Sequence, residues 1–266
     1  MVTGAASGIG RALATRCARE GMRVVLADVE APALDAAVAD VRAHGHDATG
    51  VVADVSSQDS VDELARRAYD SYGAVHLLFN NAGVLGGRPG PIWESTLNDW
   101  RWILGVNVYG VIHGLRSFVP RMLDSGEEGW VVNTASMGGL VPGGSPYGVS
   151  KHAVVAISEA LYSHLLQRDA KVGCSVLCPI YVRTQILQAD RNRPSDLVDP
   201  GVPRGTGRLA SRIESGQPPS EIADATFDGI RHGQFYIWPG DEVDHIVRER
   251  FDHILNRTNP NPKPFG

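Results

Sequence analysis

A tyrosine and a lysine, Tyr147 and Lys151, lie four residues apart in a stretch whose composition is typical of a helix. Because residues at i and i+4 share one face of a helix, the phenol and the ammonium can reach a common point. A phenol has a pKa of about 10, and a nearby cation stabilises the phenolate and lowers that pKa. The pair is therefore a candidate for proton transfer to or from a substrate oxygen. Packing alone is the alternative, and the rest of the chain has to decide between them.

A glycine-rich turn lies at the start of the chain, with Gly4, Gly8 and Gly10 spaced closely before a helical segment. Glycine lets the backbone turn sharply and approach a ligand, and the N-terminus of the following helix offers N–H groups to an anion. The pyrophosphate of a dinucleotide is the expected ligand. An ordinary turn is the alternative for this motif taken alone.

An acidic residue, Asp28, ends the next apolar run. It lies close to the offset of about 20 residues at which an acid binds the ribose diol of an adenosine. A carboxylate there accepts hydrogen bonds from both hydroxyls and repels a 2′-phosphate. Asp28 therefore favours NAD over NADP, and a role in capping the next turn is the alternative.

Predicted strands and helices alternate along most of the chain. Strands that are apolar throughout, rather than at every second residue, indicate a parallel sheet covered by helices on both faces. We therefore predict an α/β fold with a doubly wound parallel sheet of the Rossmann type in three α-β-α layers. The predicted strands are 1–3, 23–28, 48–54, 75–80, 129–136, 171–178 and 234–238.

Polar or turn-forming residues follow the predicted strands at the point where each strand ends. They are Asp28, Asp54, Asn80, Ser136 and Pro179. Because the carboxyl ends of parallel strands meet at one edge of the sheet and ligands bind there, these residues should converge on one site.

The chain is expected to form a single nucleotide-binding catalytic domain over 1–257. Residues 180–217 are rich in Pro, Gly, Arg, Asn and Ser, which predicts an irregular lid over the site. The proline-containing tail 258–266 is expected to be extended. The first strand, at 1–3, is shorter than the typical length of about five residues, so either the natural start lies upstream or this strand is truncated.

Composition limits the class of protein. The 266 residues are 43% hydrophobic and 21% charged, with a net charge of -5, which argues against a general nucleic-acid binder. No apolar run approaches the ~18 residues of a membrane span, and we expect neither a signal peptide nor a membrane association. The three cysteines lack zinc-site spacing, so we expect no metal and a cytoplasmic setting.

Taken together, these motifs resemble the short-chain dehydrogenase/reductase family over nearly the whole chain. The resemblance rests on the turn at 3–10, Asp28, Asp54-Val55, the segment 80–83, Asn107, Ser136 and the Tyr147-x-x-x-Lys151 pair.

The resemblance implies a catalytic role for four residues. Tyr147 would exchange the substrate hydroxyl proton, and Lys151 would lower the pKa of Tyr147 and bind the nicotinamide ribose. Ser136 would hydrogen-bond the substrate oxygen, and Asn107 would position a water that links Lys151 to solvent. These roles agree with the chemistry, because oxidising an alcohol removes a proton from oxygen and a hydride from carbon.

The resemblance also implies a set of residues around the cofactor. The phosphates and adenosine would be surrounded by Gly4, Ser7, Gly8, Ile9 and Gly10. Asp54 and Val55 would contact the adenine, and Asn81, Ala82 and Gly83 would line its ribose side. Pro179, Val182 and Thr184 would lie near the nicotinamide, with Val182 and Thr184 at its carboxamide.

Two features depart from the family pattern. Ile180 stands where the family has a glycine, which adds bulk beside the nicotinamide. The loop 137–146 between Ser136 and Tyr147 is a little short, which changes the wall of the substrate pocket. Neither departure removes a catalytic group.

Arginines and tryptophans form two further groups. The arginines of the lid are interpreted as solubilising, with contact to an anionic substrate or to cofactor phosphates as the alternative; they are Arg183, Arg191, Arg193, Arg204, Arg208 and Arg212. Three tryptophans, Trp93, Trp100 and Trp102, are interpreted as packing residues, of which some line a substrate entrance.

The sequence therefore predicts an NAD-dependent oxidoreductase that acts on a partly apolar secondary alcohol or ketone. One alternative is a non-catalytic protein that senses dinucleotides, because a fold does not by itself imply turnover. A lyase or epimerase that retains its cofactor is another. Apolar residues on the helices at 97–121 and 147–168 lead us to expect a homodimer or homotetramer.

Overall fold

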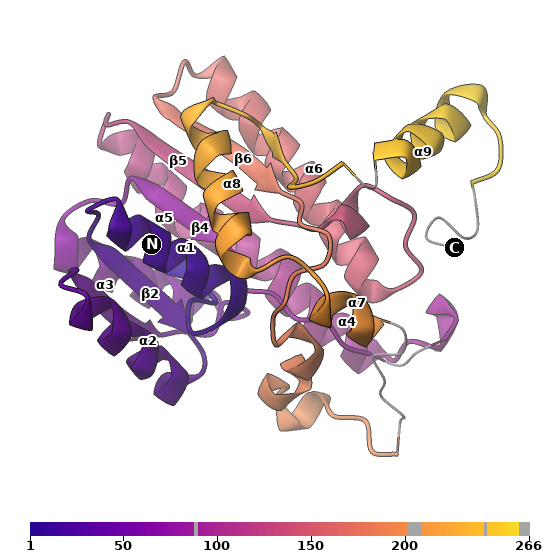
Figure 1. The fold of residues 1–266 in the computed structure, drawn as a ribbon, viewed down its shortest axis with the longest axis horizontal. Coiled ribbons are helices and arrows are strands. Elements are labelled where there is room, and N and C mark those ends of the chain that lie inside the picture. Colours follow the sequence, from indigo (N-terminus) through magenta and orange to yellow (C-terminus); the bar gives the residue numbers. More distant parts are fainter. Residues whose placement is uncertain (88–89, 202–208, 242–243, 261–266) are drawn as a thin grey trace.

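Seven parallel strands form one sheet in the order β3-β2-β1-β4-β5-β6-β7 (Figure 1). The computed structural model describes residues 1–87, 90–201, 209–241 and 244–260. The strands are β1 (Val2–Thr3), β2 (Val24–Asp28), β3 (Ala48–Val52), β4 (Leu77–Asn80), β5 (Gly129–Thr134), β6 (Val172–Leu177) and β7 (Tyr236–Ile237). The chain order reverses beside β1, so the predicted doubly wound parallel sheet is confirmed.

Helices cover both faces of the sheet. They are α1 (Gly8–Arg19), α2 (Ala31–Ala43), α3 (Gln58–Tyr72), α4 (Leu97–Leu104), α5 (Gly110–Asp124), α6 (Pro146–Gln167), α7 (Leu209–Glu214), α8 (Pro219–Arg231) and α9 (Asp244–Asn256). Alternate residues of β2 face opposite cores: Leu26 packs with α1, α2 and α8, while Val25 packs with α3 and α5. Both faces of the strands are apolar because both are covered by helices.

The first strand is as short as the sequence predicts, with two residues paired to Leu26 and Ala27 of β2. Met1 lengthens the contact between β1 and β4, which lies on the side of β1 opposite to β2. Its amino group donates to the carbonyl of Leu77 at 2.8 Å, and its carbonyl accepts from the N–H of Phe79 at 2.9 Å. These bonds hold the glycine-rich turn at the centre of the sheet.

Local signals place Tyr147 in the first turn of α6. The Ser145 side chain caps the helix by accepting from the N–H of Gly148 at 3.3 Å, and Pro146 occupies the first helical position. The helical stretch predicted around Asn107 is divided by a π-helical turn, Gly105–Tyr109, between α4 and α5. Such turns often mark functional positions.

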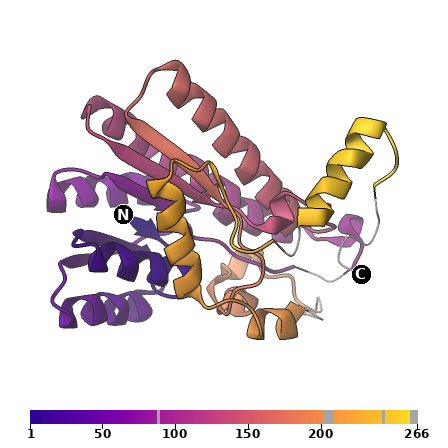
Figure 2. The same ribbon diagram turned by 45° about the horizontal axis from the view of Figure 1, so that its top comes forward.

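The predicted irregular lid holds more helix than expected. Two 3-10 segments, η4 (Ile186–Asn192) and η5 (Ser195–Leu197), are followed by α7. The N–H of Arg183 donates to the carbonyl of Gln217 at 3.0 Å, which joins the two ends of the lid. Figures 1 and 2 show these segments beside α4, beyond the carboxyl ends of the strands. These helical segments could not be predicted from the sequence because each is too short to show helical periodicity.

The last helix, α9, projects from one side of the molecule in both views (Figures 1 and 2), and it is held there by the buried Ile246 and by a hydrogen bond from Arg250 to the carbonyl of Leu140 at 2.7 Å. It begins at Asp244, and residues 242–243 lie outside the described residues. The predicted extended tail falls largely on 261–266, which also lie outside them. In the parts of the chain that the structure describes, none of the helices is both long and apolar enough to cross a membrane.

Candidate active site

A cavity of about 480 Å³ opens at the carboxyl ends of the strands. Its lining includes Ser136 and every residue predicted to contact the cofactor. Those residues are Gly4, Ser7, Gly8, Ile9, Gly10, Asp28, Asp54, Val55, Asn81, Ala82, Gly83, Tyr147, Lys151, Pro179, Val182 and Thr184. Of the predicted site residues, Asn107 alone is absent from this lining.

The glycine-rich turn leaves no room for a side chain at Gly10. A Cβ atom on Gly10 would lie 2.1 Å from the carbonyl oxygen of Gly4, so only glycine fits there. Gly4 and Gly8 have φ angles of 65° and 55°, which favour glycine. The N-terminal end of α1, which starts at Gly8, forms part of the cavity wall, and such helix ends bind phosphate.

Asp28 is held in a fixed orientation at the end of β2. One carboxylate oxygen accepts from the N–H of Ala6 at 2.9 Å, and the other accepts from the N–H of Glu30 at 3.1 Å. Each carboxylate oxygen can accept more than one hydrogen bond. Asp28 therefore keeps acceptor capacity for a ribose diol in the cavity that it lines.

Tyr147 and Lys151 lie on one face of α6, with the Lys151 Nζ atom 5.6 Å from the centre of the Tyr147 ring. Nζ also donates to the carbonyl of Thr134 at the end of β5, at 2.9 Å. Ser136 follows that strand, and its hydroxyl accepts from the N–H of Gly138 at 3.1 Å. The end of β5 and the start of α6 thus bring the three polar groups to one wall of the cavity.

The pKa of Tyr147 differs in direction from the value expected of a tyrosine beside a cation. Burial raises the pKa of Tyr147, and a hydrogen bond with Ser136 opposes this effect only in part. Burial also lowers the pKa of Lys151 to about 8. Burial therefore dominates the pKa of Tyr147 in this site, and the role of Lys151 in lowering that pKa stays a prediction.

Asn107 is fully buried behind the cavity. Its side-chain amide donates to the carbonyl of Val84 at 3.0 Å and to the hydroxyl of Ser150 at 2.9 Å, and it accepts from the N–H of Val84 at 2.8 Å. The side chain thus fixes the segment that follows Gly83 against α6. The predicted role of Asn107 in holding a water stays a prediction.

The model of the short-chain dehydrogenase family matches residues 1–195. The chain belongs to this family. It is 35% identical over 267 residues to a 1-deoxy-11-beta-hydroxypentalenate dehydrogenase of Streptomyces exfoliatus, an alignment that covers 99% of this chain and 91% of the relative. The chain is thus an oxidoreductase of the short-chain type with a nucleotide-binding Rossmann fold.

Two solved structures of similar proteins contain different nucleotides. A short-chain dehydrogenase/reductase from Burkholderia phymatum in complex with NAD is 44% identical, with a TM-score of 0.92 and coverage of 98% of this chain and 95% of that chain. A short-chain dehydrogenase from Sphingobium yanoikuyae in complex with NADPH is 25% identical, with a TM-score of 0.73 and coverage of 96% and 91%. The family therefore accommodates both cofactors.

The lid arginines were interpreted as solubilising, and this is wrong for two of them. The Arg193 side chain is completely buried against Asp99, and Arg191 pairs with Glu30 across the cavity. Arg212 donates to the Tyr181 hydroxyl at 2.8 Å, while Arg204 and Arg208 lie outside the described residues. Paired charges from distant segments leave no local pattern, so only the number of arginines could have signalled them.

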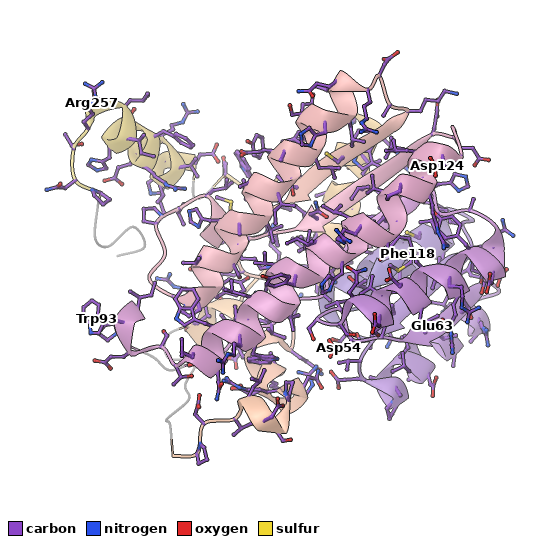
Figure 3. All side chains as sticks on the ribbon, turned by 180° about the vertical axis from the view of Figure 1, so that it is seen from behind. Asp54, Glu63, Trp93, Phe118, Asp124 and Arg257 are labelled. Carbon is purple, nitrogen blue, oxygen red and sulfur yellow. The ribbon has the colours of Figure 1, made fainter. Side chains whose placement is uncertain are left out.

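The three tryptophans differ in their surroundings. Trp102 is buried and lines the cavity, whereas neither Trp93 nor Trp100 does. Trp93 is 83% exposed and lies on the outside of the molecule (Figure 3). Ile180, which replaces the glycine of the family pattern, also lines the cavity.

Replacing Lys151 with Met is expected to stabilise the protein at pH 7 while impairing activity. Below pH 8 the folded protein must bury the charged ammonium, and this cost is present in full. Between about pH 8 and 10.5 the folded state has lost this proton and the unfolded state still holds it, so wild type gains stability as pH rises. The advantage of Lys151→Met should therefore shrink by up to about 3 kcal/mol over that window.

Denaturant titrations of both proteins across this pH range measure that advantage. The other titrating groups cancel in the comparison, and the lost hydrogen bond to Thr134 shifts the difference by a constant amount. A difference that stays constant with pH would contradict a lowered pKa of Lys151.

Proposed function

We propose that this protein transfers a hydride between NAD(H) and a secondary alcohol or ketone, with Tyr147 as the acid and base. The observation that carries the proposal is that Ser136, Tyr147 and Lys151 share one cavity with Asp28 and the glycine-rich turn. Proton-transfer groups and a dinucleotide cradle are both needed for this reaction. Their presence in one cavity also weighs against a protein that only senses dinucleotides.

Each of the three polar groups has a separate task in the proposed reaction. Tyr147 takes the hydroxyl proton when the alcohol is oxidised, and Ser136 donates a hydrogen bond to the oxygen as negative charge develops on it. Lys151 lies close enough to stabilise charge on the phenol, and we expect it to bind the nicotinamide ribose. A bound nicotinamide supplies the hydride acceptor and a positive charge that adds to that of Lys151.

The preference for NAD rests on negative charge at the adenosine end. Asp28 lines the cavity there, and a 2′-phosphate would meet its carboxylate, whereas the charge of Glu30 is paired with Arg191. The NAD complex of the Burkholderia phymatum relative, at 44% identity, supports this choice.

The remaining wall of the cavity is apolar, which fits a mid-sized, partly apolar substrate. Its residues include Val84, Leu85, Trp102, Met137, Ile186 and Ala189. Ligand sites of this kind bind by apolar contact and orient the ligand with a few polar groups. The Streptomyces relative, named for a hydroxypentalenate, supports a hydroxylated carbon skeleton as the substrate class.

Association into a homo-oligomer is part of the proposal. Exposed apolar side chains lie on the predicted contact helices, among them Tyr162 and Leu166 of α6 at 40% and 63% exposure, with Tyr109 beside α5 at 54%. Covering such residues is a common result of self-association. Light scattering would test this, and a monomer at all accessible concentrations would contradict it.

A panel of secondary alcohols and ketones, each tested with NAD(H) and NADP(H), tests the proposed reaction. We expect the near-ultraviolet absorbance of the reduced nicotinamide to change with bulky, largely apolar members, and faster with NAD(H). Tight binding of NADH without turnover of any member would contradict the proposal and favour a sensing role.

A further inference from the structure

Two arginines of the lid, Arg191 and Arg193, reach in different directions from one short segment. Arg191 lies in η4 and Arg193 follows it directly. Arg191 contacts Glu30 just after β2, at the end of the cavity where Asp28 lies. Arg193 contacts Asp99 in α4, beside the apolar wall. One segment is therefore tied to both halves of the cavity.

The first contact, between Arg191 and Glu30, lies at the adenosine end of the cavity. The Arg191 guanidinium donates to a Glu30 carboxylate oxygen at 2.6 Å, and the Asn192 amide donates to the same oxygen at 2.7 Å. The hydrogen bond from Arg191 lowers the pKa of Glu30. Because the Glu30 N–H also donates to Asp28, the contact is connected to the residue that we expect to hold the ribose.

The second contact is fully buried. The Arg193 Nη1 atom lies 2.7 Å from an Asp99 carboxylate oxygen, with side-chain exposures of 0% and 4%. The guanidinium carbon lies 5.0 Å from the centre of the Trp102 ring, within the range of a cation–π contact. Arg193 therefore holds the aromatic side chain that forms part of the apolar wall.

Asp99 is itself rigidly placed on α4. It forms a capping box with Thr96, whose side chain accepts from the N–H of Asp99 while Asp99 accepts from the N–H of Thr96. Thr96 and Asn98 also donate to Asp199, which follows η5 in the lid. The start of α4 thus holds the lid at Arg193 and again at Asp199.

We propose that Arg191 and Arg193 are positioning residues that hold residues 186–199 as a strap across the cavity. Arg191 sets how fast the nicotinamide nucleotide leaves, because the strap must detach from Glu30 to open the adenosine end. Arg193 sets the shape of the substrate wall through Trp102. The second statement rests on the proposed function, whereas the first requires only nucleotide binding.

Stopped-flow measurement of the release of bound NADH tests the proposed role of Arg191, which is the first arm of the proposal. This measurement requires no turnover. Arg191→Gln and Glu30→Gln should each raise the dissociation rate by about two- to fivefold, as expected for a hydrogen-bonded ion pair that is partly exposed. Arg231→Gln is the matched control, because it removes an Arg–Glu pair of 2.7 Å between α8 and α1, away from the cavity. Unchanged release from both cavity variants would overturn this arm.

Steady-state kinetics test the second arm of the proposal, the effect of Arg193 on the substrate wall. Asp99→Asn keeps an oxygen for the capping box but removes the charge opposite Arg193, and it should raise the substrate KM by about tenfold through a displaced wall. The rate of NADH release should stay near that of wild type. A fall in kcat with unchanged KM would overturn the assignment to the substrate wall.

Removal of Arg193 tests the same arm more severely. Arg193→Met removes the buried positive charge that lies against Asp99, which destabilises folding, whereas the double variant Arg193→Met with Asp99→Asn removes both charges and should fold. Hydrogen exchange in residues 186–199 should be faster in the double variant than in wild type, whether or not an alcohol is turned over. Unchanged exchange would overturn the strap even if the proposed reaction proved wrong, so the two failures are distinguishable.

Discussion

Tyr147→Phe is expected to lower kcat by about 10³-fold, within the range of 10²–10⁴ that general acid–base catalysis contributes. The variant keeps the aromatic ring on α6 and loses only the hydroxyl that we propose exchanges the substrate proton. NADH affinity should change little, because the dinucleotide cradle at Gly4, Gly8 and Asp28 is untouched. The measurement is kcat on an accepted alcohol, with NADH affinity followed by fluorescence.

Tyr162→Phe is the matched control for this loss. Tyr162 lies on the same helix, is 40% exposed and packs against the Phe235 ring outside the cavity. Its kcat should equal that of wild type. Turnover that survives Tyr147→Phe, at a rate similar to that of Tyr162→Phe, would show that another group moves the proton.

Asp28→Ala is expected to reduce the preference for NAD over NADP by about 10- to 100-fold. The reason is the loss of two hydrogen bonds to a charged acceptor, worth about 1.5–3 kcal/mol, together with the loss of repulsion toward a 2′-phosphate. The ratio of kcat/KM for the two cofactors measures the preference. Weaker use of NAD should account for most of the change, because the ribose diol of NAD makes both of the lost hydrogen bonds.

Asp40→Ala serves as the control for charge removal, since Asp40 lies on α2 and pairs with Arg11 at the surface. It should leave the ratio of the two cofactors unchanged. If Asp28→Ala also left the affinities for NAD and NADP unchanged, the assignment of Asp28 to the adenosine ribose would be wrong.

Much of the fold and of the cavity could be predicted from the sequence because a parallel sheet collects strand ends at one edge. Asp28, Asp54 and Ser136 are far apart in the chain, yet each follows a strand whose apolar composition is easy to recognise. Once those strands are parallel, the three residues must lie near one another. The glycine-rich turn was similarly predictable, since no other residue fits at Gly10.

The contacts of the lid could not be predicted in this way. Arg193 and Asp99 are 94 residues apart, and neither belongs to a periodic pattern that would indicate burial. From the sequence alone, the two residues of a buried ion pair cannot be distinguished from two charged residues at the surface. The raised pKa of Tyr147 was missed for a related reason: the effect of a neighbouring cation follows from spacing, but the loss of solvent follows only from how deeply the site is enclosed.

The departure at Ile180 illustrates a prediction that the structure makes more specific. The sequence indicates only added bulk where a glycine is usual. In the folded protein Ile180 lines the cavity and also packs with the buried cluster that contains Cys178. Its bulk therefore narrows the cavity at a position that buried residues support, and we expect it to form part of the substrate wall.

Direct transfer of deuterium tests the central claim most closely. A secondary alcohol that carries deuterium on its carbinol carbon is incubated with NAD, and the mass of the reduced nucleotide is measured. We predict that the wild-type protein yields singly deuterated NADH and that Tyr147→Phe yields almost none in the same time. Reduced nucleotide without deuterium, or equal labelling by both proteins, would contradict hydride transfer from this carbon with Tyr147 as the base.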